Sequence, residues 1–312
     1  MGGWCPFLPL FFLWCAFSSP HFLHAAFFPF TLSLLNQLVP ANRAHFLSSE
    51  GCELVLRLIH EAGRARFGAL KALSFACTGQ EGGSSSLTSM CTAIVKAGGL
   101  KSLFPAFMGL GLPHTRAVHG AAAVPLEEEY VASIFAALLW HLPRGGGDGE
   151  GMERVRVLSK FTEDKGVKAA RLLELRVAYA GRVARAQEKF DEEKEEEEDE
   201  EDEEDEEAQL LKEMDRMEAL LKAGLFSLQR VDLIIARILC EPLYLKQQGG
   251  GGATTPSATS TAILEKCNSA AFELRAKLHE QGCSTVEILE SLSGYAKGLE
   301  GADEAKAAEP CA

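Results

Sequence analysis

The sequence predicts an all-α protein in which short helices stack side by side as an α-solenoid. From residue 47 onwards apolar residues recur three and four positions apart, which marks helices with one buried face. Glycines such as Gly63, Gly79 and Gly98 follow these segments, and glycine commonly ends a helix. No stretch shows a convincing strand pattern. Short helices that each need a neighbour are typical of helical repeats, and a single bundle is the competing architecture.

Four short amphipathic helices are expected in the first third of the chain, at about 48–62, 67–78, 86–97 and 100–108. The third shows the pattern clearly, with apolar side chains at Leu87, Met90, Cys91, Ile94 and Val95. Each of these helices is apolar on one side only, so each is expected to pack against a neighbour.

The middle of the chain is expected to begin with a loop at 109–125 and to continue with a strong helix at 126–142. Acidic residues in the first turn of that helix suit the positive end of the helix dipole. The same explanation covers the other carboxylates outside the acidic run, so they do not indicate an active site. After a glycine-rich break, residues 152–190 are expected to be largely helical.

The predicted organisation places a helical array at 43–246, which contains an acidic low-complexity insert at 191–207. Within this array the helix at 225–240 is apolar almost all round and should be central. A Gly/Ser/Thr linker at 247–259 is expected to be flexible. A helix pair at 260–300 and a disordered tail at 301–312 complete the chain.

The acidic insert dominates the charge of the chain. Residues 191–207 hold 16 acidic residues and one lysine, whereas the whole chain has 44 acidic and 31 basic residues and a net charge of −13. The remainder is therefore near neutral, a balance that indicates neither nucleic acid nor a membrane surface as a partner. A block of like charges repels itself, so we expect residues 191–207 to be an extended, solvated segment.

Residues 1–42 contain no Lys, Arg, Asp or Glu and four prolines before residue 30. We expect this segment to lie outside the fold. A secretory signal would have such an apolar core but normally carries a basic start, and a membrane span would need about 20 unbroken apolar residues. A gene-model artefact is the third interpretation. If the signal were real, the chain would be a secreted or membrane-anchored helical protein.

Neither catalytic nor cofactor-binding residues are indicated. Two glycine-rich loops, at 79–86 and 144–151, lack a preceding strand and a phosphate-binding motif. The nine cysteines are odd in number and form no Cys-x-x-Cys, which favours a reducing compartment over a disulfide framework or a zinc site. The nearest approach to a metal-ligand set, Cys267, His279 and Cys283, is better explained as ordinary positions of one helix.

A basic stretch at 152–189 holds ten Lys and Arg residues against five acids, and a basic helix can follow phosphates. It has no interleaved aromatic residues for stacking, and the anionic insert follows it directly. A solvated helix face is therefore favoured over direct contact with nucleic acid.

Several blocks, in one order, resemble the C-terminal part of the beta-catenin-like protein 1 family. They cover roughly residues 33–300, and the most specific is "LSKFTEDKGVKAARLLELRVAYAG" at 158–181. The others include "GLKSLFPAFMG" at 99–109, "EEEYVASIFAALLWHL" at 127–142 and "AGLFSLQRVDLIIARILC" at 223–240. The family carries more repeats upstream and a basic import signal that this chain lacks. Its segment before residue 223 is mixed in charge, whereas here it is nearly pure acid.

The resemblance implies an armadillo-like fold and a non-enzymatic nuclear scaffold of the spliceosome, associated through the nineteen complex. It also implies protein partners that present basic, nuclear-localisation-type segments, with no small-molecule substrate, cofactor or metal. A mobile anionic segment could attract such partners. The candidate partner-binding residues are Glu195, Glu196, Glu197, Glu198, Asp199, Glu200, Glu201, Asp202, Glu203, Glu204 and Asp205.

Overall fold

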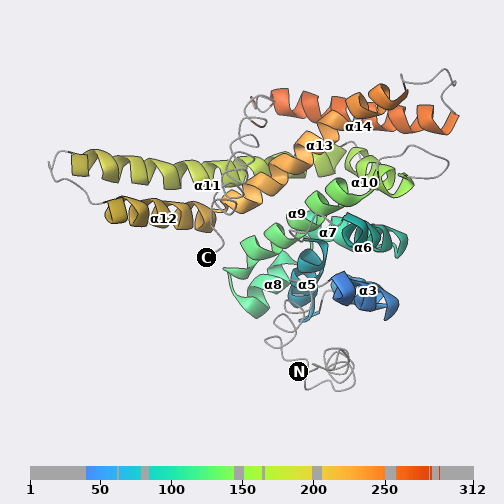
Figure 1. The fold of residues 1–312 in the computed structure, drawn as a ribbon, viewed down its shortest axis with the longest axis horizontal. Helices are drawn as coiled ribbons and strands as arrows, with labels where there is room; N and C mark the ends of the chain where they lie inside the picture. Colours follow the sequence, from blue (N-terminus) through green and yellow to red (C-terminus); the bar gives the residue numbers. More distant parts are fainter. Residues whose placement is uncertain are drawn as a thin grey trace, which may run out of the picture. The chain divides into compact units, whose positions relative to one another are not determined.

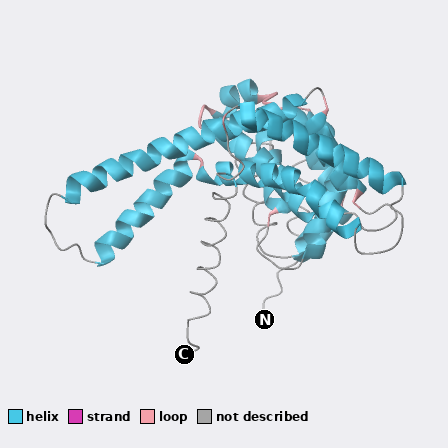
Figure 2. Cartoon of the chain, turned by 90° about the horizontal axis from the view of Figure 1, so that it is seen from above, coloured by secondary structure: helices cyan, strands magenta, loops and turns pink. Residues whose placement is uncertain are grey.

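The structure is a computed structural model. It describes residues 40–61, 63–78, 84–143, 151–163, 166–198, 206–249 and 258–280, with residues 282 and 288. Within these ranges the regular elements are α-helices and no strand occurs (Figures 1 and 2), which confirms the predicted all-α class. Residues 1–39, the tail and most of the predicted last helix lie outside this part of the chain.

The chain divides into two compact units, Met1–Val157 and Leu158–Ala312. The sequence indicated no boundary inside the predicted array at 43–246, and the structure places one within α10 (Met152–Thr162). The described helices of the first unit are α3 (Pro40–Ser48), α4 (Gly51–His60), α5 (Arg66–Cys77), α6 (Ser84–Lys96), α7 (Leu100–Phe107), α8 (Leu112–His119) and α9 (Ala123–His141). Those of the second are α11 (Val167–Glu198), α12 (Glu206–Ala223), α13 (Leu225–Gly249) and α14 (Ala258–Glu280).

Helix α9 is the centre of the first unit and contacts α5, α6, α7 and α8. Residues 131–139 are buried without a break, because small and apolar side chains surround the helix there. The Phe135 ring packs against Phe104 and Phe107, with centroid distances of 4.7 and 5.4 Å. Aromatic contacts of this kind stabilise a core beyond the area that they bury.

The loop predicted at 109–125 is partly wrong, since it contains α8 and the first turn of α9. Gly111 precedes α8 and Gly120 ends it, and both have a positive φ that glycine adopts without strain. Thr115 is the buried residue of α8. With no apolar face the helix leaves no periodic signal in the sequence.

The prediction that carboxylates outside the acidic run lie at helix starts, where the helix dipole explains them, is wrong for Glu127. Because α9 begins at Ala123, Glu127 lies in the second turn, and it is fully buried. Its carboxylate accepts hydrogen bonds from the Arg66 guanidinium, at 2.5 Å, and from the Thr115 hydroxyl. The buried ion pair links α5 to α9, and the Thr115 bond adds α8. The helix dipole does not explain this arrangement.

The first described helix, α3, begins at Pro40, so the predicted boundary of the non-folded segment at residue 42 lies inside a helix. Arg43 of this helix is buried and donates hydrogen bonds to the Thr78 carbonyl oxygen, at 3.1 Å, and to Ser86 Oγ, at 3.3 Å. Burying one guanidinium against two acceptors ties α3 to α5 and α6.

Helix α13 is central in the second unit, as predicted, and contacts α11, α12 and α14. Inside this core Arg176 Nε of α11 donates to Asp232 Oδ1 of α13 at 2.8 Å, and Asp232 is fully buried. The predicted linker at 247–259 is too long, because α13 extends to Gly249 and α14 starts at Ala258.

Candidate functional site: the acidic helical hairpin

The acidic run lies at the end of a helical hairpin. Residues 191–198 continue α11, so the four candidates Glu195–Glu198 form its last turn, and residues 206–207 open α12. The other seven candidates, 199–205, lie outside the described residues. Helices α11 and α12 run side by side (Figures 1 and 2) and contact each other.

The prediction of an extended segment is therefore wrong for residues 191–198. Glutamate has a good intrinsic helix propensity. Once a helix is nucleated, each further residue adds a hydrogen bond at little cost, and α11 has already run from Val167. Repulsion between neighbouring carboxylates is screened in water and salt, so it does not outweigh this propagation.

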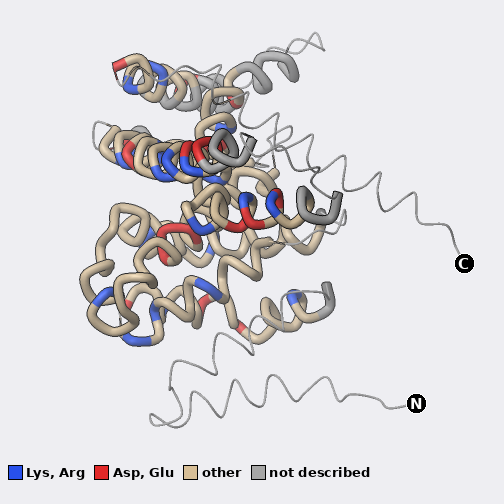
Figure 3. The backbone as a smooth tube through the Cα atoms, turned by 90° about the vertical axis from the view of Figure 1, so that its left-hand side faces the viewer, with Lys and Arg blue, Asp and Glu red and all other residues tan. Residues whose placement is uncertain are grey.

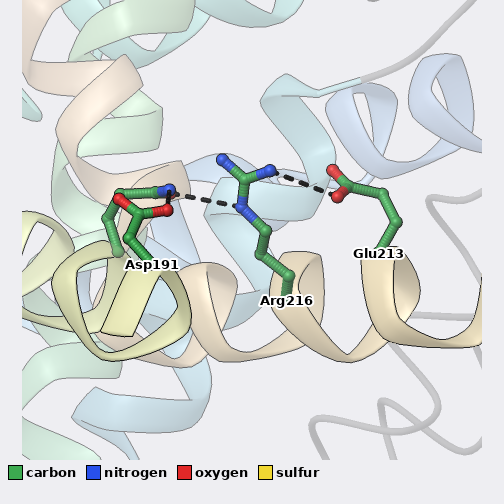
Figure 4. Close-up of polar contacts among 4 residues, drawn as sticks. Asp191, Glu213 and Arg216 are labelled. Carbon is green, nitrogen blue, oxygen red and sulfur yellow. Dashed lines mark hydrogen bonds and ion pairs between the residues drawn. The ribbon is translucent and has the colours of Figure 1, made fainter. Parts of the chain in front are cut away.

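A chain of hydrogen bonds joins the two helices below the acidic end (Figure 4). Gln187 Nε2 donates to Asp191 Oδ1 at 2.9 Å, and Gln187 Oε1 accepts from Arg216 Nε at 3.3 Å. Arg216 Nη1 donates to Glu213 Oε2 at 3.2 Å. These contacts fix the register of α11 against α12, and they hold the first residue of the acidic run in an ordered stem.

The base of the hairpin depends on a close approach between helices. Gly224 separates α12 from α13 with φ +104°, and a Cβ added there would overlap the Tyr179 ring of α11. Only glycine meets both demands, because an L side chain is strained at that φ and would also clash.

We expect Gly224→Ala to destabilise the second unit by about 1–3 kcal/mol, the cost of a strained backbone position. Thermal unfolding followed by circular dichroism measures the change. Gly181→Ala is the matched control, since Gly181 lies within α11 and its Cβ would meet only Arg185 Nη1, at an ordinary distance of 3.7 Å. That control should stabilise by roughly 0.5–1 kcal/mol. A neutral Gly224→Ala would contradict the packing described here.

The stem also carries a basic groove of about 410 Å³ between α11 and α12. Four of its lining residues are basic, namely Arg182, Arg185, Lys189 and Lys222, and four are apolar, namely Ala186, Phe190, Ala219 and Ala223. The hairpin thus has cations along its stem and a dense acidic run at its end. Over the other described helices basic and acidic residues are interspersed (Figure 3), in line with the near-neutral remainder of the sequence.

Three cysteines that are distant in sequence meet in the core of the first unit. Cys77 and Cys91 share a hydrogen bond, and Cys52 lies close enough to influence both. Burial raises the pKa of the Cys52 thiol to about 12, and the bond to Cys91, together with burial, raises the pKa of Cys77. Cys52 and Cys77 therefore stay protonated at neutral pH and pack as small apolar side chains.

The described residues also bear on two other classes of site, metal centres and membrane spans. No group of three or more His, Cys, Asp and Glu side chains among them is arranged to hold a metal ion. Of the helices described here, none is both long and apolar enough to cross a membrane. Among the residues that come nearest to a metal-ligand set in the sequence, His279 is exposed on α14 and Cys283 lies outside the described ranges.

Comparison with known proteins places the chain in a family. Residues 27–250 match the model of the family described as catenin-beta-like, Arm-motif-containing nuclear proteins. Human beta-catenin-like protein 1 is 34% identical over 202 residues, which are 64% of this chain and 32% of the human protein. The cattle protein is 35% identical over the same length, and a fission yeast homologue is 32% identical over 130 residues, 42% of this chain and 19% of its own.

The chain thus spans about a third of the length of the animal relatives it matches. The Arm-motif description agrees with the succession of helices in the structure, so the armadillo-like class predicted from the resemblance is confirmed. On this evidence the chain belongs to the catenin-beta-like, Arm-motif-containing family.

Proposed function

We propose that this chain is a non-enzymatic protein-binding module of a nuclear scaffold for pre-mRNA splicing. Family membership supports the class of protein, and the family's description as nuclear supports the location. The association with the nineteen complex comes from the resemblance alone. Helical repeats present large surfaces for partner proteins, which suits a scaffold.

The observation that carries the proposal is the acidic end of the α11–α12 hairpin. Residues 191–207 hold 16 acidic side chains, and the stem below them is ordered by the hydrogen bonds of Gln187 and Arg216. A dense charge on an ordered stem creates a local field that attracts cations over a Debye length of about 8 Å at physiological salt. Basic, nuclear-localisation-type segments of splicing factors are the partners with the matching charge.

The test uses a variant in which the acidic residues of 195–205 become Gln or Asn. Glutamine keeps the last turn of α11 helical, whereas a Gly/Ser replacement would melt it. Asp191 is retained so that its bond to Gln187 survives. For a flexible Lys/Arg-rich peptide we expect the association rate to fall roughly tenfold at low salt, because the steering field is removed.

Salt supplies the control for this prediction. The difference between native and variant rates should shrink toward ~0.5 M salt, where the Debye length is only a few Å. Stopped-flow fluorescence of a labelled peptide measures both rates. Equal association rates at low salt would reduce the run to a spacer and refute its role in attracting partners.

A further inference from the structure

One face of α12 is apolar and open to solvent. Leu210, Leu211, Met214, Met217 and Leu221 are 63, 56, 60, 45 and 49% exposed. Clustered exposure of large apolar side chains marks a surface where other molecules bind, whereas single exposed residues are common and carry no meaning.

This face points away from the partner helix within the hairpin. The α12 residues that lose most solvent contact are Leu220, which is buried, and Arg216, Ala219 and Ala223, which are half-buried. At 100° per residue these four side chains lie on the side of the helix opposite the exposed leucines and methionines. The hairpin therefore uses one side of α12 for its own packing and leaves the other side open.

The exposed side chains follow a coiled-coil repeat. Leu210, Met214, Met217 and Leu221, which we call the α12 seam, are spaced four, three and four residues apart. That is the spacing of the a and d positions at which one helix receives another. The seam is roughly 17 Å long at 1.5 Å per residue, enough for three turns of a partner helix. Its methionines adapt readily to different partner side chains.

Charges beside the seam define the chemistry of the occupant. Glu213 flanks it on one side and Glu218 on the other, at the positions that form salt bridges across a coiled coil. Both carboxylates are exposed and pair with cations of α12 itself, Glu213 with Arg216 at 3.2 Å and Glu218 with Lys222 at 2.6 Å, and the bond from Lys222 lowers the pKa of Glu218. Exposed pairs of this kind contribute little, so both carboxylates are free to exchange these cations for those of a docked helix. Beyond Leu210 the helix leads directly into the acidic run. A complementary helix therefore carries Lys or Arg beside its own apolar seam.

A second copy of this chain fits the seam poorly. In a parallel pair, Glu213 of one copy would face Glu218 of the other, and like charges at these positions repel. In an antiparallel pair each glutamate would face a leucine and gain no partner.

We propose that the α12 seam docks an amphipathic helix of a partner protein, with apolar residues at heptad spacing and Lys or Arg on both flanks. The inference rests on the proposed protein-binding function and adds to it a second, contact-based step. The acidic run accelerates the encounter, and the seam holds the bound helix by burying apolar surface. Loss of the seam should therefore raise the dissociation rate, whereas loss of the run should lower the association rate.

The test uses the full chain and designed peptides of about 21 residues, three heptads. The first peptide has leucine at a and d and lysine at e and g, the second has glutamate at e and g, and the third is a flexible Lys-rich peptide without apolar residues. The seam variant carries Met214→Glu and Met217→Glu. Glutamate keeps α12 helical and adds negative charge, so a loss of binding to a basic peptide comes from the apolar contacts.

We expect the seam variant to bind the Leu/Lys peptide at least about tenfold more weakly than the native chain, as for central apolar anchors. Val177→Glu is the matched control, because Val177 is a 50% exposed apolar residue on α11, and it should leave binding unchanged. The Leu/Glu peptide should bind neither protein measurably. Fluorescence anisotropy gives the affinities and stopped flow the two rate constants.

Three outcomes would overturn the seam proposal. The first is equal affinity of the native chain and the seam variant for the Leu/Lys peptide. The second is an equal loss of affinity in Val177→Glu. The third is a dimer of the native chain in sedimentation velocity that the seam variant abolishes.

The flexible peptide separates this proposal from the proposed function. Suppose that the flexible peptide binds the native chain and the seam variant equally well, and that the Leu/Lys peptide also has the same affinity for both. The seam proposal is then refuted, and the role of the acidic run stands. If neutralising the run changes nothing while the seam variant loses the Leu/Lys peptide, the run fails and the seam stands.

Discussion

Glu127→Ala is expected to destabilise the first unit by about 3–5 kcal/mol, the usual cost of removing one partner of a buried ion pair. The Arg66 guanidinium is buried against this carboxylate, so the variant leaves a positive charge in the core without its counterion. The Thr115 hydroxyl also loses its acceptor. Urea unfolding gives the free energy, and hydrogen exchange of peptides from α5, α8 and α9 shows where protection is lost.

Two controls separate the buried charge from a general loss of packing. Glu53→Ala removes an exposed carboxylate from α4 and should change stability by less than about 0.5 kcal/mol. The double variant Arg66→Met with Glu127→Leu removes both charges and should recover most of the loss, since a buried pair is often replaceable by apolar residues. If the double variant were less stable than Glu127→Ala alone, the uncompensated charge would not be the cause.

Helix periodicity explains how much of this fold could be predicted. The expected helix at 86–97 became α6, and Leu87, Met90, Cys91, Ile94 and Val95 are all buried in it. These side chains pack on one face because three- and four-residue spacing places them there whatever the neighbour is. Apolar spacing along the sequence is therefore sufficient to predict a helix where burial of one face contributes most of its stability.

Apolar periodicity is insufficient to predict a helix that is stabilised by a buried polar contact. Helix α8 has no apolar stripe, and its buried residue Thr115 donates a hydrogen bond to Glu127, twelve residues further on. Glu127 itself finds Arg66 sixty-one residues away. A single sequence shows the charges but not their distances, so the nearest local explanation, the helix dipole, was applied to Glu127 wrongly.

The same limit applies to the hairpin. The acidic run was evident from composition, but its helical start depends on the length of α11 before it. Gln187 and Arg216 meet only because α11 and α12 pair, and they are 29 residues apart. The spacing of the α12 seam is present in the sequence, but periodicity alone does not distinguish an exposed apolar face from a buried one. Its exposure becomes visible when the burial of Leu220 shows which side of α12 is used.

Asp232→Ala is expected to have a comparable effect on the second unit, a loss of about 3–5 kcal/mol. Asp232 is fully buried in α13 and accepts the Arg176 Nε–H of α11 at 2.8 Å, and the Arg176 side chain is only 10% exposed. Removing the carboxylate leaves the guanidinium buried without this counterion in the core that anchors the hairpin. Asp232→Asn retains an acceptor oxygen and the volume, so it should cost less, about 1.5–3 kcal/mol for a hydrogen bond to a charged group.

The location of the damage distinguishes this variant from Glu127→Ala. Hydrogen exchange should accelerate in α11 and α13 of Asp232→Ala, because their shared ion pair is lost, while α5 and α9 of the first unit keep the Arg66–Glu127 pair. Since α11 is also the stem of the acidic hairpin, the same variant should weaken docking of the Leu/Lys peptide in proportion to the unfolded fraction of the second unit. Full protection of α11 and α13 in Asp232→Ala would mean that the ion pair does not hold them together, and that apolar packing along α13 alone supports the hairpin.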